Sequence, residues 1–205
     1  MENFVSKQKI DFFRGLNFYV PAYQRGYKWR RSDVRKLLLD ISGLNQYEFS
    51  GEYCLQPIVV AKYPEKGDNA YILVDGQQRL TTLMLILTLY EGVAPYYINY
   101  ETRDESNDFL KKFKEGCAAR EKGESYSGKE TCDIHFFKDA IEEICINSSC
   151  KENFLKNLSK VVMIWYLVDK DQGAKHFERL NSKKIGLTKY RIGKSTFPHK
   201  SSQRL

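Results

Sequence analysis

The stretch Tyr71-Ile-Leu-Val-Asp-Gly-Gln-Gln-Arg-Leu-Thr-Thr-Leu83 is an apolar run that polar residues interrupt before it resumes. Residues 71–74 are β-prone, and the dipeptide Asp75-Gly76 is typical of a tight turn. Apolar residues then recur at the i, i+3, i+4, i+7 spacing of a helix, at Leu80, Leu83, Met84 and Leu87. The stretch therefore predicts a strand, a tight turn and a helix in succession.

The polar residues of this stretch fall at the start of the predicted helix. The first backbone N–H groups of a helix lack intrahelical partners and its dipole is positive there, which favours an anion and above all a phosphate. Gly76 would let the backbone approach a ligand closely, and Arg79 could grip a phosphate with two nitrogens. The other donors of the cluster are Gln77, Gln78, Thr81 and Thr82.

Asp75 is the one acid in this cluster. It could hold a magnesium ion, orient Arg79 or position a water molecule. It could equally do no more than cap the helix, with the glutamines and threonines exposed to solvent. The local chemistry leaves these alternatives open.

Length and composition indicate a globular protein. The 205 residues suit one domain with an elaboration, or two small domains, and the hydrophobic content is 42%. Residues 1–9 are too polar for a signal peptide, and the longest apolar stretch, residues 83–90, is far short of the ~20 residues that a membrane helix needs. We therefore expect a cytoplasmic protein with no membrane partner.

The chain has five cysteines and no C-x-x-C pair. An odd number without such pairs favours reduced thiols over a disulfide framework. Cys132, His135, Cys145 and Cys150 could in principle surround zinc. Their spacing matches no familiar finger, so we expect no metal site there and ordinary thiols instead.

The net charge of +7 comes from the end of the chain. Residues 179–205 hold eight Lys and Arg and no Asp or Glu, so the rest has 25 basic and 26 acidic residues, a net charge of −1. One segment, residues 14–36, is nevertheless locally basic, with seven cations and one acid, and it is rich in aromatic residues. Tyr23, Tyr27 and Trp29 could stack on nucleic acid bases or pack into the core.

The remaining elements predict an α+β fold, a small mixed sheet with packed helices and a helical insertion. We expect a hairpin that brings residues 75–79 to the edge of the sheet, and a helix that starts after an N-cap at Ser32 and ends near Gly43. The other expected elements are a short helix within 4–13, strands at 16–21, 51–61, 93–100 and 161–168, helices within 101–160 divided by a loop at 116–130, and a helix at 174–181.

Three segments together resemble a known family. They are Val20-Pro-Ala-Tyr-Gln-Arg-Gly-Tyr-Lys-Trp29, Asp75-Gly-Gln-Gln-Arg-Leu-Thr-Thr82 and Phe177-Glu-Arg-Leu-Asn181 with Leu187. In order and rough spacing they are similar to the N-terminal domain of GmrSD-type, type IV restriction enzymes, which is ParB/sulfiredoxin-like. The resemblance covers about residues 10–188.

The resemblance implies a nucleotide-binding and NTP-hydrolysing domain that regulates an anti-phage restriction system directed at modified DNA. The expected divisions are a ParB-like core at 1–100, a helical insertion at 101–160 and a closing strand and helix at 161–188. Where the family would continue into another apolar helix, this chain has a basic tail without helical periodicity at 189–205. It also places a strand with Gly51, Gln56 and Pro57 beside the residues at 75–79. Implied ligands are a nucleoside triphosphate with magnesium.

The resemblance also assigns roles to individual residues. Asp75, Gln78 and Arg79 would be catalytic. The residues implied to bind the nucleotide are Gln24, Arg25, Gly76, Gln77, Thr81, Thr82 and Asn181.

Relatives usually continue into a nuclease domain with a histidine-based HNH motif, whereas this chain has only His135, His176 and His199. We therefore expect it to be truncated or frame-shifted, to depend on a separate nuclease domain or subunit, and not to cut DNA alone. Two alternatives are a ParB-like DNA-binding module that uses residues 14–36, and an inactive remnant.

Overall fold

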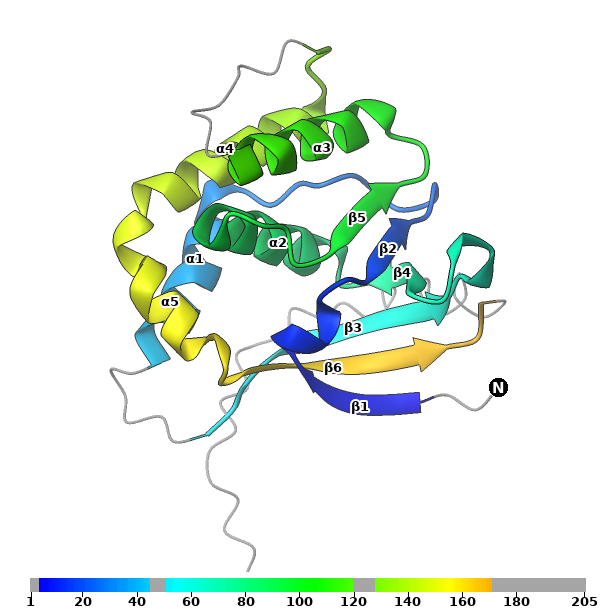
Figure 1. Ribbon diagram of the computed structural model, residues 1–205, viewed down its shortest axis with the longest axis horizontal. Coiled ribbons are helices and arrows are strands. Elements are labelled where there is room, and N and C mark those ends of the chain that lie inside the picture. Colours follow the sequence, from blue (N-terminus) through cyan, green and yellow to red (C-terminus); the bar gives the residue numbers. More distant parts are fainter. Residues whose placement is uncertain (1–3, 45–50, 120–127, 171–205) are drawn as a thin grey trace, which may run out of the picture.

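The computed structural model describes residues 4–44, 51–119 and 128–170. They form one mixed sheet of six strands with five α-helices on one side of it (Figure 1), which confirms the predicted fold class. The strands are β1 (Phe4–Lys9), β2 (Asn17–Val20), β3 (Tyr53–Lys62), β4 (Ala70–Asp75), β5 (Tyr97–Tyr100) and β6 (Val161–Val168). The helices are α1 (Arg31–Ser42), α2 (Gln77–Glu91), α3 (Asp104–Ala119), α4 (Cys132–Ile146) and α5 (Lys151–Leu158).

The strands lie in the order β1-β6-β3-β4-β2-β5. The pair β3 and β4 is antiparallel, as expected for a hairpin, whereas β2 is parallel to both β4 and β5. Because β4 lies between β3 and β2, residues 75–79 lie at the edge formed by the strand ends and do not lie on an edge strand of the sheet. They lie at the carboxyl end of an interior strand.

The central helix α2 is buried on all sides. Figure 1 shows it between the sheet and the pair α3 and α4, and every residue from Leu83 to Thr88 is buried. A helix surrounded in this way needs apolar residues around its whole circumference, which explains the run Leu-Met-Leu-Ile-Leu at 83–87. The predicted order of strand, turn and helix is confirmed.

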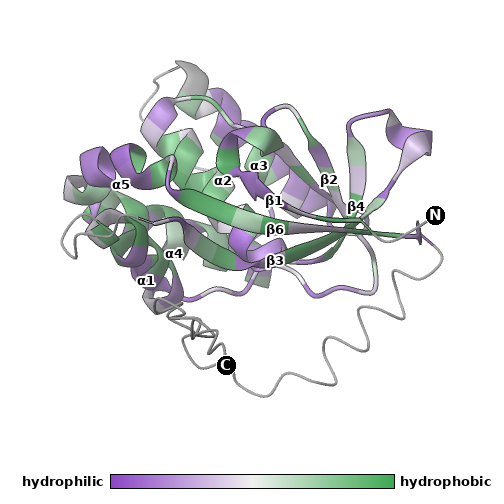
Figure 2. Cartoon of the chain, turned by 90° about the horizontal axis from the view of Figure 1, so that it is seen from below, coloured by the Kyte–Doolittle hydropathy of each residue, from purple (hydrophilic) through white to green (hydrophobic). Residues whose placement is uncertain are grey.

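The sheet is apolar on both faces. On the helix side, Leu73 and Ile58 join the large core that also contains Phe109, Phe137 and Phe154 of α3, α4 and α5. On the other side, a smaller buried cluster consists of strand residues only: Val59, Ala61, Val74 and Val168. Figure 2 accordingly shows β3 and β6 as hydrophobic along most of their length.

Three sequence-based boundaries need correction. The segment expected as a short helix begins with the strand β1, since β6 supplies its backbone partners, and ends in a 3-10 turn, Ile10–Phe13. The N-cap of α1 is Arg30 rather than Ser32, because the carboxylate of Asp33 accepts from the Arg30 N–H at 3.1 Å. Helix α3 runs through Gly116, the start of the expected loop. The helix expected at 174–181 lies outside the described residues.

Candidate functional site

Three parallel strands end at the same edge of the sheet. The chain leaves β2 into Pro21, β4 into Gly76 and β5 into Glu101, and these strands are neighbours in the order β4-β2-β5. In sheets of parallel strands with helical connections, ligands bind outside the carboxyl ends of the strands. The candidate site is therefore this edge, and it contains two of the three segments that carry the family resemblance.

The N-terminus of α2 opens onto this edge. The first intrahelical hydrogen bond runs from the Leu80 N–H to the Gly76 carbonyl at 3.0 Å, and no side chain caps the helix. Within the described part of the chain, the amides of Gln77, Gln78 and Arg79 therefore have no intrahelical acceptor. Together with the helix dipole, such amides attract an anion.

Position 76 requires a glycine, both for its backbone conformation and because Ile58 of β3 lies close to it. Its φ is +98°, in the left-handed region, and a Cβ there would lie 2.4 Å from Cγ2 of Ile58. The sequence suggested that Gly76 allows close approach of a ligand. The structure shows instead that the Gly76 backbone lies close to the side chain of Ile58. The absence of a side chain at Gly76 therefore allows the start of α2 to lie against β3.

Arg79 lies against a bulge in β3. The pairing of β3 with β6 shifts register between Leu55 and Ile58, and the guanidinium donates there to Oε1 of Gln56 and to the carbonyl oxygen of Pro57. The expected placement of Gln56 and Pro57 beside Arg79 is thus confirmed. Both acceptors are neutral.

The Arg79 side chain is half-buried. Its Nε is buried and has no hydrogen-bond partner. Burial lowers the pKa of the guanidinium, and the negative charge of Asp75 opposes that shift. Among the described residues no carboxylate forms an ion pair with Arg79, so its charge is offset only from a distance, by Asp75.

The other polar residues of the motif are held in internal hydrogen bonds. Gln78 accepts from the Lys28 N–H at 2.8 Å and donates to the Gly26 carbonyl at 3.0 Å. Thr82 bonds the hydroxyl of Tyr27 at 2.8 Å. These contacts tie the start of α2 to the segment after β2.

Further internal bonds involve Gln24, Gln77 and Thr81. The amide nitrogen of Gln24 donates to the carbonyls of residues 73 and 74 at 2.5 and 3.0 Å. Gln77 and Thr81 both contact the hydroxyl of Tyr100, at 3.4 and 3.2 Å. Burial raises the pKa of Tyr100 to about 12, so its hydroxyl stays protonated. Contacts of these side chains with a nucleotide stay a prediction.

The side chains of Asp75 and Arg25 lack the internal hydrogen bonds that hold the other polar residues of the site, as far as the structure describes the chain. Arg25 is exposed and Asp75 is partly exposed, and neither side chain makes a hydrogen bond or an ion pair to any residue that the structure describes. Both remain available to a ligand. The predicted site residue Asn181 lies outside the described residues.

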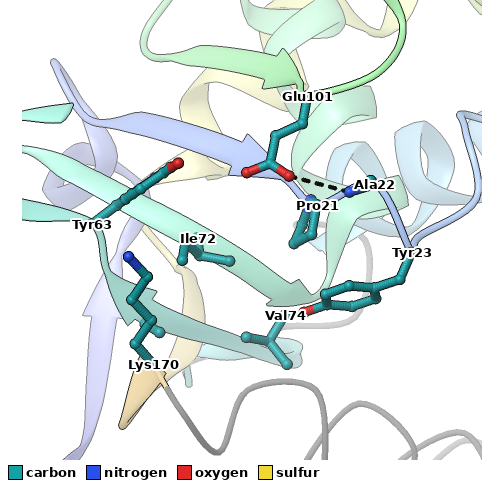
Figure 3. Close-up of a pocket in the computed structure, with 9 residues that line it drawn as sticks. Pro21, Ala22, Tyr23, Tyr63, Ile72, Val74, Glu101 and Lys170 are labelled. Carbon is teal, nitrogen blue, oxygen red and sulfur yellow. Dashed lines mark hydrogen bonds between the residues drawn. The ribbon is translucent and has the colours of Figure 1, made fainter. Parts of the chain in front are cut away.

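A pocket of about 280 Å³ adjoins the strand ends (Figure 3). Its floor is apolar, with Ile72 and Val74 between Tyr63 and Tyr23 in Figure 3. Glu101 lies at the rim, where Oε2 accepts from the Ala22 N–H at 3.2 Å. The full lining is Pro21, Ala22, Tyr23, Ala61, Tyr63, Ile72, Val74, Glu101 and Lys170.

Sequence reasoning missed Tyr63, Glu101 and Lys170. Lys170 follows β6, pairs with Glu65 at 2.6 Å and lies 4.7 Å from the ring centroid of Tyr63. The one signal in the sequence was the position of Glu101 directly after a predicted strand. Nothing local indicated that β5 would lie beside β2.

The basic segment at 14–36 is partly neutralised. Arg14 pairs with Asp11 and Glu91, and Arg31 and Arg35 pair with carboxylates of α4. Tyr27 is buried and stacks on Phe137 with centroids 5.0 Å apart. DNA binding by this segment stays a prediction. Because three of its arginines form ion pairs, its support is weaker than the sequence suggested.

The described residues contain no cluster of metal-ligating side chains. Over residues 4–44, 51–119 and 128–170, no three or more His, Cys, Asp or Glu side chains lie close enough to hold a metal ion. All five cysteines are described, and all are free thiols. Among the helices that the structure describes, none is both long and apolar enough to cross a membrane.

Comparison with known protein families identifies the family of the chain. No curated protein matches the chain significantly. The family model described as the N-terminal domain of the GmrSD restriction endonuclease matches residues 1–198, a range that includes all three segments of the predicted resemblance. The chain therefore belongs to the family of GmrSD restriction endonuclease N-terminal domains, which are parts of restriction systems in phage defence.

Proposed function

We propose that this domain binds and hydrolyses a nucleoside triphosphate with magnesium and thereby regulates DNA restriction by a nuclease domain or subunit. The observation that carries the proposal is the half-buried guanidinium of Arg79, whose hydrogen bonds to the described residues go only to neutral oxygens while its Nε is buried without a partner among them. A phosphate group would supply the missing counter-charge. The site would act in the cytoplasm, where reduced thiols and nucleoside triphosphates are both expected.

The surroundings of Arg79 favour the phosphate chain of a small ligand over the backbone of a DNA duplex. The open amides of α2 and the half-buried Arg79 belong to the first turn of the same helix, whereas duplex binding uses exposed cations spread along a surface.

Asp75 fits a magnesium ion. Its carboxylate is partly exposed and has no partner among the described residues, and magnesium in phosphate sites is held through one or two carboxylates and the phosphates themselves. Magnesium, when bound, offsets the negative charge that builds up on phosphate oxygens during hydrolysis. Asp75 would hold it, and Arg79 would stabilise the same charge.

Gln78 has a different role in this proposal. Both ends of its amide are occupied by Gly26 and Lys28, so it would position the segment that carries Arg25 rather than act on a water molecule. Arg25 would then close over the phosphates from outside. Neither Gln78 nor Arg25 transfers a proton in this scheme.

A thermal-shift screen with the four nucleoside triphosphates, with and without magnesium, tests the proposal together with a phosphate-release assay. A ligand at ~100 Kd adds ~2.7 kcal/mol, which raises the Tm by roughly 5–10 °C. Arg79→Lys keeps the charge but loses the planar fork, so both signals should fall. Asp75→Asn should remove the magnesium dependence.

Arg14→Ala is the matched control, since it removes an exposed arginine that pairs with Glu91, near the other end of α2. It should leave nucleotide binding unchanged. The proposal fails if no triphosphate raises the Tm of the wild type, or if Arg79→Lys and Arg14→Ala respond to nucleotide alike.

A further inference from the structure

We propose that Asp133 is a positioning residue for the phosphate site, and that its carboxylate fixes the backbone next to Arg25. Asp133 belongs to α4 and lies outside the three segments that resemble the family. The inference rests on the proposed function, because the position of Arg25 matters to the site only if Arg25 binds phosphates. It makes the helical layer over the sheet part of that site.

The backbone of Arg25 lies beside the turn from β4 into α2. The residue before it, Gln24, donates to two carbonyl oxygens near the end of β4, at 2.5 and 3.0 Å. The residue after it, Gly26, accepts from Gln78 in the first turn of α2 at 3.0 Å. The two neighbours of Arg25 thus contact the chain on either side of residues 75–77, so Arg25 is held next to the open amides of the helix.

The carboxylate of Asp133 occupies the space where residue 26 would otherwise carry a side chain. A Cβ on Gly26 would lie 2.0 and 2.1 Å from the two carboxylate oxygens and 2.2 Å from Cγ. The φ of Gly26 is not positive, so its backbone conformation is open to other residues. The carboxylate alone therefore excludes a side chain there, and Gly26 is held between Asp133 of α4 and Gln78 of α2.

Contacts within the helical layer hold the Asp133 side chain in place. It is only 6% exposed, and Oδ2 accepts from Nη1 of Arg103 at 3.2 Å and from the hydroxyl of Ser106 at 3.3 Å. It lies in the first turn of α4, where the helix dipole favours a negative charge. Phe109 of α3 stacks on Phe137 of α4 with ring centroids 5.5 Å apart, which keeps the two helices side by side. The carboxylate is therefore a rigid support for the Gly26 backbone.

Loss of the Asp133 carboxylate would leave the Gly26 backbone free to move toward α4. Gln78 and the hydrogen bond between Tyr27 and Thr82 would still tie the segment to α2, so its fold would persist while its exact position changed. The exposed side chain of the residue between Gln24 and Gly26, Arg25, would then lose its alignment. Because the planar guanidinium fork binds phosphate only in a defined geometry, a small shift there weakens binding.

The experiment is a double-mutant cycle by calorimetry on the full chain, with the magnesium complexes of ATP, GTP, CTP and UTP as probes. Arg25→Ala should weaken binding about tenfold, since a charged hydrogen bond is lost. Asp133→Ser vacates the space against Gly26 and should weaken binding about three- to tenfold. In the Arg25→Ala background, Asp133→Ser should change the affinity by less than about twofold, because the residue that it positions is gone.

Three further variants complete the cycle. Asp133→Asn keeps the volume against Gly26, so it should bind within about twofold of the wild type. Gly26→Ala displaces the same backbone in a chain that retains Asp133, and should weaken binding in the presence of Arg25 but not in its absence. Asp104→Ser, at an exposed aspartate in the first turn of α3, is the matched control and should leave binding unchanged.

Two results would overturn the inference while nucleotide binding through Arg79 stands. One is that Gly26→Ala, or a folded Asp133→Ser, binds the probes as tightly as the wild type does. The other is that Asp133→Ser weakens binding equally with and without Arg25, which would indicate a general loss of structure. If no probe binds the wild type, or if binding does not depend on Arg79, the proposed function fails and this inference fails with it.

Discussion

The side-chain amide of Gln78 donates to the backbone carbonyl of Gly26 at 3.0 Å, across 52 positions of sequence. The side-chain oxygen of Gln78 accepts a hydrogen bond from the backbone N–H of Lys28, two residues after Gly26, at 2.8 Å. Gly26 in turn lies against the start of α4, where a Cβ would come within 2.0 Å of Oδ2 of Asp133. These contacts hold together the two motifs of the candidate site, at residues 20–29 and 75–82.

The Gln78 contact predicts the behaviour of Gln78→Glu. The substitution keeps the acceptor for Lys28 but places a carboxylate oxygen against the Gly26 carbonyl. We expect a loss of about 1–3 kcal/mol in the free energy of unfolding, measured by urea denaturation. Gln8→Glu, which alters a local bond to Ser6 in β1, should cost less. Equal losses in the two variants would contradict this account.

Gly76→Ala should destabilise the protein by about 2–4 kcal/mol, from the left-handed φ and from the clash with Ile58. The control is Gly15→Ala, which has a φ of +77° but no atom within 4 Å of its Cβ, and so reports conformational strain alone. The difference between the two Tm values isolates the contact with β3. In an Ile58→Ala background, which removes Cγ2, this extra cost should shrink, and an unchanged extra cost would contradict the assignment to Ile58.

Tyr27→Phe removes one buried hydrogen bond and keeps the ring on Phe137. We expect a loss of about 1 kcal/mol in the free energy of unfolding, against about 3–5 kcal/mol for Tyr27→Ala. Tyr97→Phe, at an exposed tyrosine of β5, should have no measurable effect. If Tyr27→Phe were as harmful as Tyr27→Ala, the hydroxyl rather than the stacking would dominate, contrary to this prediction.

Glu143 predicts a pH dependence of stability. It is buried in α4, and the hydrogen bonds from Arg35 at 2.6 and 3.2 Å lower its pKa. Its unfolded pKa is about 4.3, so its contribution is present above that pH and is lost as pH falls through the lower folded value. The Tm gap between wild type and Glu143→Gln should therefore be widest near neutral pH and should narrow below about pH 4.

The control for that experiment is Glu142→Gln, at an exposed carboxylate that pairs with Arg31 on the same two helices. Its Tm gap should be small at every pH, because exposed ion pairs contribute little. A gap for Glu143→Gln that stays constant from neutral pH to about pH 3 would contradict the assignment of the pKa shift to Arg35.

Much of the fold follows from local patterns. The run at 71–87 predicted strand, turn and helix because the apolar spacing changes within a few residues, and the apolar run at 161–168 predicted β6. Residues 4–9 were expected to belong to a short helix within 4–13. They form β1 through pairing with β6, whose sequence lies more than 150 positions away.

Sequence reasoning could identify only those site residues that lie close to one another in the sequence. Arg79 and Asp75 stood out because they sit at the start of a predicted helix. That Gln24, Gln77 and Thr81 bond to the protein itself depends on tertiary contacts, such as the one with Tyr100. Glu101 joins the site because β5 pairs with β2, which no local signal shows.

The most direct test of the central claim is calorimetric titration of magnesium-nucleoside triphosphate into the wild type, Arg79→Lys and Arg14→Ala. The account predicts one binding site in the wild type, the same affinity in Arg14→Ala, and a loss of at least about tenfold in Arg79→Lys, because a bidentate contact is removed. Binding to Arg79→Lys with wild-type affinity would contradict the claim that Arg79 holds the phosphates.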